Sequence, residues 1–214
     1  MAAPRPKKKA AARTTQQAAR EAFRADLRQA AERVFAEKGF VATKMVDVAR
    51  AANVAVGTLY NYFQSKETIF EELCATRAAD FHARLLETGK GSPPLVRLEQ
   101  LIRTCFDYLD EHGALFAVFV ERGGSAEYDI ERLGGSATER SHERFLRMLE
   151  ATIASAVEAR ELRADVPVAT MASLLSGAMN GATYAWLKRR RRGRLSEVTP
   201  DLLSLFLSGA RRTP

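Results

Sequence analysis

Residues 43–67 read TKMVDVARAANVAVGTLYNYFQSKE, and this stretch predicts two short helices joined by a tight turn. Thr43 is expected to cap the first helix, and Asp47 lies in its first turn, where the helix dipole favours an acid. That helix ends at Asn53, a residue type that tolerates the left-handed backbone of a turn. A turn of about four residues then leads into a helix over 56–62, and helices connected in this way form a helix-turn-helix.

The helix over 56–62 has one side for the core and one side for a partner. Leu59 and Phe63 are four residues apart, so both can pack inward. The outward positions are Val56, Gly57, Thr58, Tyr60 and Asn61. Such a surface suits a DNA groove, because a small residue lets the backbone approach the duplex, hydroxyl and amide groups can bond base edges, and a valine methyl can meet a thymine methyl.

Three further side chains are candidates for the DNA backbone. Tyr60, Tyr62 and Lys66 can reach phosphates, which fix the register of a protein on DNA without reading its sequence. Ser65 is expected to cap the next helix, whose first N–H groups suit a phosphate. The alternative for the whole stretch is an ordinary small helical core with an exposed helix.

The rest of the chain also shows helical periodicity. One apolar face runs from Phe23 to Phe35 in a first helix that Gly39 ends. Further helices are expected from Ser65 to a break at 88–94, from there to Gly113, over 137–161, from Pro167 to Lys188 and over 199–210. Ala114–Val120 is a short apolar segment, and the glycine pairs at 123–124 and 134–135 frame a loop. Strand-like alternation does not persist, so the sequence predicts an all-α protein.

Charge is concentrated at the N-terminal end. Residues 1–66 carry 13 Lys/Arg and 5 Asp/Glu, a net charge of +8, while the whole chain has +7. A basic end of this kind indicates a surface that binds a polyanion, and both nucleic acid and an anionic membrane are partners of this kind. Residues 1–19 are predicted to be a flexible basic arm, either a solvated tail or a DNA-touching segment. The basic run at 188–194 is expected to be an exposed loop.

Several function classes find no support in the sequence. The sequence shows none of the features that indicate an enzyme, namely a nucleophile with a base, a carboxylate pair or a phosphate-binding loop. No catalytic residue and no cofactor are therefore expected. His82, His112 and His142 share no metal-ligand spacing, so no metal is expected. Cys74 and Cys105 suit a reducing compartment, and the absence of a secretory signal or membrane span predicts a cytoplasmic protein.

Two strings, AAERVFAEKGF at 30–40 and DVARAANVAVGTLYNYFQSKETIF at 47–70, resemble the TetR/AcrR family of transcriptional regulators. The resemblance implies a recognition helix at 56–62, phosphate contacts from Tyr62 and Lys66, and a C-terminal ligand-binding and dimerisation region. It places a three-helix helix-turn-helix domain at 20–80, with the motif at about 43–63, and a long fourth helix leading into a second domain at 81–214.

The sequence departs from the family pattern at three places. Asn53 stands where the family often has Gly, and it can serve the same turn. Ala55 stands where Ser or Thr often caps the recognition helix, which costs about 1 kcal/mol unless another group replaces the cap. Lys44, Met45 and Val46 occupy the start of the preceding helix, so a base contact from Val46 is not expected. Thr43 and Lys44 remain candidate DNA-binding residues, Lys44 through a phosphate.

The C-terminal region carries candidates for an effector pocket and for a dimer interface. The pocket candidates are Phe106, Phe116, Phe119, Met148, Asn180 and Tyr184, each of which can also be plain core. The apolar lining favours an uncharged or lipophilic small molecule. The interface candidates are Gly177, Gly181, Leu202, Leu205 and Phe206, although the glycines can also serve packing inside one subunit.

The expected protein is a homodimeric repressor that binds a near-palindromic double-stranded operator and releases it on binding the effector. The alternative is a DNA-binding protein without a small-molecule effector.

Overall fold

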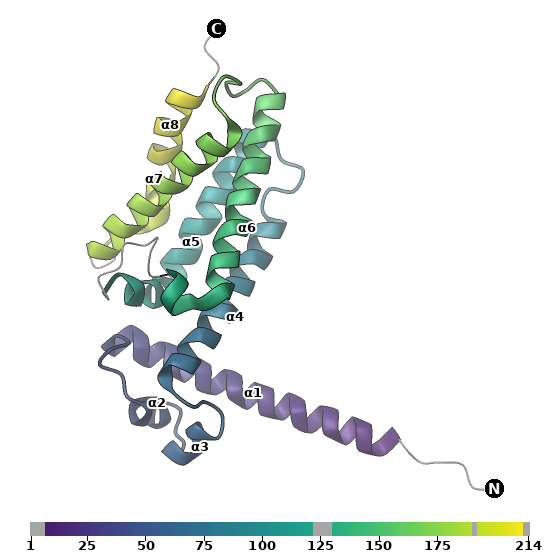
Figure 1. Cartoon of the computed structure of the whole chain (residues 1–214), viewed down its shortest axis with the longest axis vertical. Helices are drawn as coiled ribbons and strands as arrows, with labels where there is room; N and C mark the ends of the chain where they lie inside the picture. The colour runs from purple at the N-terminus through teal and green to yellow at the C-terminus, as the bar shows by residue number, and fades with distance from the viewer. Residues whose placement is uncertain (1–6, 122–129, 190–191, 212–214) are drawn as a thin grey trace, which may run out of the picture. The chain divides into compact units, whose positions relative to one another are not determined.

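The computed structural model describes residues 7–121, 130–189 and 192–211, with side chains described at 15–113, 140–189 and 192–211. Its elements in chain order are α1 (Lys7–Lys38), α2 (Met45–Ala51), α3 (Val56–Tyr60), α4 (Lys66–Glu87), α5 (Pro94–Glu121), α6 (Ile130–Glu158), α7 (Val168–Lys188), the 3-10 helix η1 (Leu195–Val198) and α8 (Thr199–Ala210) (Figure 1). Every regular element in this part of the chain is helical, which confirms the predicted all-α class.

The chain divides into two compact units, residues 1–73 and residues 74–214. The boundary falls inside α4, so this one helix belongs to both units. The sequence placed the boundary at 80–81, seven residues further along the same helix.

The first unit is built on one face of α1. Its inner side chains are buried as the periodicity predicts, and they are Leu27, Ala30, Ala31, Val34 and Phe35. The rings of Phe35, Phe40 and Phe70 lie within 5.0–5.9 Å of one another between centroids, which fixes α1 against the start of α4. In this unit α2 and α3 lie on the same side of α1 (Figure 1).

The start of α1 differs from the prediction. Residues 7–19 were expected to be a flexible arm, but α1 already begins at Lys7. The segment is rich in Ala, Gln, Lys and Arg, all strong helix formers, so it can continue the helix that the apolar face anchors further along. Residues 1–6 lie outside the described residues.

The second unit packs α5 to α8 around one apolar core. The largest of its fully buried side chains include Leu98, Leu101, Phe106 and Tyr108. The predicted helices from Pro167 to Lys188 and over 199–210 are confirmed as α7 and α8, which run side by side along one edge of this unit (Figure 1). None of the described helices has the length and apolarity needed to cross a membrane.

Three predicted boundaries in this unit are wrong. Gly113 does not end a helix, because α5 continues through it to Glu121; glycine disfavours a helix interior by only about 1 kcal/mol, which packing can offset. The helix expected from 137 begins at Ile130 and includes the second glycine pair. It ends at Glu158, three residues early, where Arg160 takes a left-handed conformation with φ 60° and the Glu161 N–H bonds to the Ala156 carbonyl.

Candidate nucleic-acid interface

The turn between α2 and α3 is closed by backbone hydrogen bonds. Asn53 has φ 54°, its N–H bonds to the Arg50 carbonyl at 3.1 Å, and the Val54 N–H bonds to the Ala49 carbonyl at 2.9 Å. These two bonds make a Schellman motif, which stops a helix and turns the chain sharply. The left-handed role predicted for Asn53 is therefore confirmed.

The short helix α3 is anchored by two side chains. Leu59 and Phe63 are both buried, as the four-residue spacing predicts. The Arg24 guanidinium of α1 lies 4.5 Å from the centre of the Phe63 ring, so the anchor is covered from outside by a cation. Ala55 occupies the N-cap position with an extended backbone and no side-chain hydrogen bond, which confirms the missing cap.

The opposite side of α3 is open. Val56, Gly57, Tyr60 and Asn61 are exposed, Tyr60 with 52% of its surface free, and Thr58 is half-buried. A Cβ atom added to Gly57 would meet no atom within 4 Å. An exposed helix face that is small and partly apolar favours a partner more than it favours solvent. Contact of these residues with DNA stays a prediction.

Tyr62 follows α3 and is held by α1. Its ring meets the ring of Phe23 edge-on at 5.2 Å, and the Arg20 guanidinium lies 5.6 Å from its centre. Both contacts fix the ring beside the exposed end of α3. A phosphate contact from its hydroxyl stays a prediction.

Lys66 does not stand free for a phosphate. Its ammonium donates to three backbone carbonyls, those of Phe40 at 2.8 Å, Val41 at 3.1 Å and Thr43 at 3.0 Å. An ammonium has three N–H donors, and all three are used here. In this structure the ammonium that was predicted to contact a phosphate binds the loop between α1 and α2.

Thr43 also differs from its predicted role. It is buried, and its hydroxyl donates to the Gly39 carbonyl at 2.7 Å, so it neither caps α2 nor offers its side chain to DNA. The N-cap is Lys44, whose backbone N–H donates to Asp47 Oδ2 at 3.0 Å. Lys38 donates to the same carboxylate at 2.8 Å and, with the Lys44 N–H, holds the pKa of Asp47 below its ordinary value. Lys44 itself is exposed, as a phosphate contact requires.

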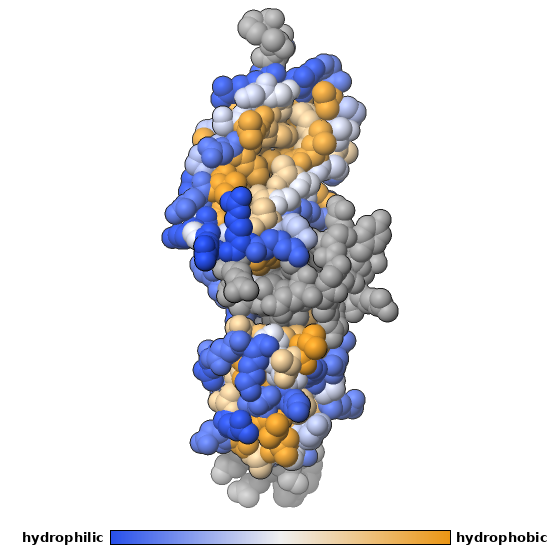
Figure 2. Space-filling model, turned by 90° about the vertical axis from the view of Figure 1, so that its left-hand side faces the viewer, coloured by the Kyte–Doolittle hydropathy of each residue, from blue (hydrophilic) through white to orange (hydrophobic). Residues whose placement is uncertain are grey.

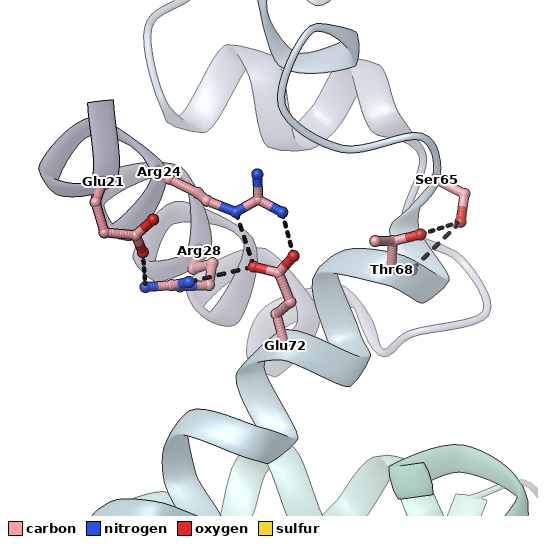
Figure 3. Close-up of polar contacts among 6 residues, drawn as sticks. All are labelled: Glu21, Arg24, Arg28, Ser65, Thr68 and Glu72. Atoms are coloured by element: carbon pink, nitrogen blue, oxygen red, sulfur yellow. Dashed lines mark hydrogen bonds and ion pairs between the residues drawn. The ribbon is translucent and has the colours of Figure 1, made fainter. Parts of the chain in front are cut away.

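An ion-pair network ties α1 to α4 (Figure 3). The Glu72 carboxylate accepts from Arg24 at Nε and Nη2 and from Arg28 at 3.2 Å, and Arg28 also pairs with Glu21 at 3.1 Å. Sequence reasoning missed this network, because the partners lie 44 and 48 residues apart and no local spacing connects them.

The predicted Ser65 cap is confirmed, since its hydroxyl accepts from the Thr68 N–H at 3.3 Å.

The effector-pocket candidates differ in their burial. Phe106 is fully buried and Met148 packs against the same core, whereas Asn180 is half-buried. Tyr184 is 40% exposed, with the Lys188 ammonium 5.3 Å from its ring centre, so it lies at the surface of α7, and a pocket contact from it stays a prediction. Its spacing from Gly177 and Gly181 places it on their side of α7. Phe116 and Phe119 lie outside the residues whose side chains are described.

The dimer-interface candidates are divided between the surface and the core. Gly177 and Gly181 are exposed with open space around them, and Leu205 is 77% exposed. Leu202, by contrast, is 7% exposed and belongs to the core of its own subunit, as its place on the inner side of α8 requires; Phe206 is half-buried against it. Figure 2 shows apolar surface gathered over the edge of the second unit that α7 and α8 form.

A turn of this geometry between α2 and α3, with an exposed second helix, defines a helix-turn-helix protein. Residues 27–73 match the model of the family described as bacterial regulatory proteins, tetR family. The match covers the helix-turn-helix and the helices on either side of it, which is the part of the chain where the sequence resembles this family.

Individual proteins give the extent of the similarity. The chain is 31% identical over 97 residues to the transcriptional repressor KstR2 of Rhodococcus jostii, covering 45% of this chain and about half, 48%, of that protein. It is 26% identical over 192 residues to the repressor DhaR of a Mycobacterium species, covering 88% and 94% of the two chains. The structure of FadR from Bacillus subtilis in complex with stearoyl-CoA matches with a TM-score of 0.70 and 22% identity, covering 86% of this chain and 97% of that one, and so shares the fold.

Proposed function

We propose that the protein is a transcriptional repressor that reads a near-palindromic double-stranded operator with α3. The observation that carries this proposal is the division of α3, with Leu59 and Phe63 buried while Val56, Gly57, Tyr60 and Asn61 are exposed. Thr58 and Asn61 bond base edges, Val56 meets a thymine methyl, and Tyr60, Tyr62 and Lys44 contact phosphates. The KstR2 and DhaR relatives are repressors, which supports the same role here. The protein acts on the chromosome and therefore in the cytoplasm.

The working form is a homodimer joined through α7 and α8. Leu174 is 67% exposed and Leu205 is 77% exposed, on the two helices that form the apolar edge. Gly177 and Gly181 lie exposed on α7 and leave room for a second helix to approach closely. Large exposed aliphatic side chains grouped in this way mark a protein–protein contact. A two-fold dimer then sets two recognition helices one turn of B-DNA apart, which requires a palindromic site.

A small lipophilic effector releases the operator by binding the second unit. The core of that unit contains Phe106, with Met148 and Cys105 packed against it. Burial raises the pKa of the Cys105 thiol to about 12, so this thiol stays neutral at physiological pH. The FadR neighbour holds stearoyl-CoA, which supports an acyl or other apolar group as the ligand class. An effector acts only if it binds the DNA-free conformation more tightly than the operator-bound one.

The proposal is tested by selecting bound duplexes from random DNA and then adding long-chain fatty acids or their CoA esters. Enrichment of a near-palindrome, with affinity that falls as salt rises, supports the operator and dimer. Release of that duplex by one of the lipids supports the effector. A selected operator that no lipid releases favours the second candidate, a DNA-binding protein without an effector. No enrichment at all overturns the proposal.

A further inference from the structure

We propose that Lys66 is a positioning residue that locks the first turn of α4 to the loop preceding α2, and that it supplies no phosphate contact. This inference rests on the proposed DNA-binding function and concerns how its reading surface is held. The lock consists of the Lys66 ammonium and the carbonyls of Phe40, Val41 and Thr43, at 2.8–3.1 Å. The ammonium also lies 4.7 Å from the centre of the Phe40 ring.

Lys66 carries its charge at an unfavourable place in its own helix. Lys66 is the first residue of α4, where the helix dipole disfavours a cation. Its charge is instead met by three carbonyl oxygens that approach from a different part of the chain. Hydrogen bonds from a charged donor are about twice as strong as neutral ones, and here one donor group makes three of them. The local cost of a cation at this helix end is therefore offset by contacts 23–26 residues away.

The loop held by Lys66 sets where α2 begins. Gly39 ends α1 with φ 74°, and its carbonyl accepts from the Thr43 hydroxyl. Lys66 bonds to three of the next four carbonyls. Lys44 then starts α2, with its N–H on Asp47. The lock thus connects the α4 start to the α2 start, and α2 in turn supports α3 through the turn at Asn53.

Removal of the Lys66 charge should have different effects if the side chain holds the loop and if it contacts a phosphate. A lysine on a phosphate releases a counterion, so its loss lowers the slope of log affinity against log salt by about 1. A lysine that binds backbone carbonyls leaves the slope unchanged, and its loss instead loosens the loop and the helix that follows it. Lys44 provides the matched control, because it is also a lysine of this region and its side chain is exposed.

The experiment compares Lys66→Met, Lys66→Gln and Lys44→Met in the full-length chain. Hydrogen exchange is measured at the amides of Val48, Ala52 and Val54, which bond within α2 and its turn. Binding to a mixed-sequence DNA duplex is measured as a function of salt. Gln is neutral but keeps N–H donors, so it separates the loss of hydrogen bonds from the loss of charge.

For Lys66→Met we expect exchange at these amides to accelerate by about tenfold or more, with the wild-type salt slope retained. Lys66→Gln should restore part of the protection, also at the wild-type slope. Lys44→Met should keep the protection and lose about 1 unit of slope. If Lys66→Met does not fold, Lys66→Gln is read alone, against Lys44→Met.

The proposal is overturned if the Lys66 variants lose about 1 unit of slope while exchange in α2 is unchanged. The exchange measurement uses the free protein, so it tests the lock even if the chain fails to bind DNA. Failure of the lock and failure of the proposed function are thereby distinguished.

Discussion

Arg24 of α1 and Glu72 of α4 form a two-point ion pair, with Arg24 Nε donating to Glu72 Oε2 at 2.9 Å and Nη2 donating to Oε1. The same guanidinium covers the ring of Phe63, the residue that anchors the end of the recognition segment. One arginine therefore joins α1, α4 and the helix-turn-helix. Loss of the Glu72 carboxylate should remove the two-point pair, and the guanidinium over Phe63 is then held by α1 alone.

Glu72→Gln is expected to destabilise the first unit by about 1 kcal/mol, because it removes a charge-assisted pair that is partly exposed and so partly screened. Denaturant unfolding followed at the transition of this unit measures the effect. Glu71→Gln is the control, since Glu71 is the exposed neighbour on the same helix. Equal stability of the two variants would show that the network contributes nothing.

The Arg24–Glu72 pair should make the stability of the fold sensitive to acid. The hydrogen bond from Arg24 is the largest cause that lowers the pKa of Glu72 below its ordinary value of 4.5. A carboxyl whose pKa is lower in the folded state stabilises that state above its unfolded pKa, and this contribution is lost as pH falls through the lowered value. Unfolding measured from neutral pH down through this range should show a steeper acid loss for the wild type than for Glu72→Gln. Parallel stability curves for the two proteins would exclude Glu72 as a source of this acid loss.

Gly57→Ala separates folding from DNA binding. The added methyl meets no atom of the chain within 4 Å, and alanine favours a helix over glycine by about 1 kcal/mol. The variant should be as stable as the wild type or more so, yet bind the operator more weakly, because the methyl projects between α3 and the duplex. Thermal unfolding and a binding titration on the same preparation check this. Unchanged affinity would mean that DNA does not approach Gly57.

Ala55→Ser should stabilise α3. Ala55 occupies the N-cap position with an extended backbone and provides no side-chain acceptor. A serine there can accept from an N–H of the first turn, a gain of about 1 kcal/mol. Slower hydrogen exchange at Leu59, whose N–H bonds to the Ala55 carbonyl, is the readout. Ala51→Ser, at the exposed end of α2, is the control and should give no gain.

Leu205→Glu tests the proposed dimer. A charge at this 77% exposed position does not disturb the core of the subunit, but it would be buried against a second copy. Light scattering should show a dimer for the wild type and a monomer for the variant, with operator affinity lost alongside. Leu86→Glu changes an exposed leucine of α4 and should leave the dimer intact. A Leu205→Glu protein that still dimerises would exclude this face.

The sequence predicted best the features that depend on neighbours in the chain. The four-residue spacing of Leu59 and Phe63, the turn residue Asn53 and the cap at Ser65 each act within a few positions, so local patterns identified them. The hydrogen bonds that Lys66 and Thr43 make within the chain were missed for the opposite reason. Their hydrogen-bond partners depend on how the loop at 39–43 folds back, and no spacing rule expresses that.

Faces of the later helices were predicted only in part. Tyr184 and Leu202 are both large and apolar, so composition alone could not decide which points inward. The structure places Leu202 in the core and Tyr184 on the surface, a result set by the rotation of α7 and α8 against the rest of the unit. Gly113 shows the same limit, because its own propensity predicts a helix end and α5 nevertheless continues to Glu121.

Selection of bound duplexes from random DNA, repeated with Asn61→Ala, tests the central claim most directly. The wild type should enrich a near-palindrome whose half-sites lie about one helical turn apart. The variant should lose about 1–3 kcal/mol of affinity for that site and relax its preference at the same position in both halves. An identical selected sequence for both proteins would contradict the assignment of α3 as the reading helix.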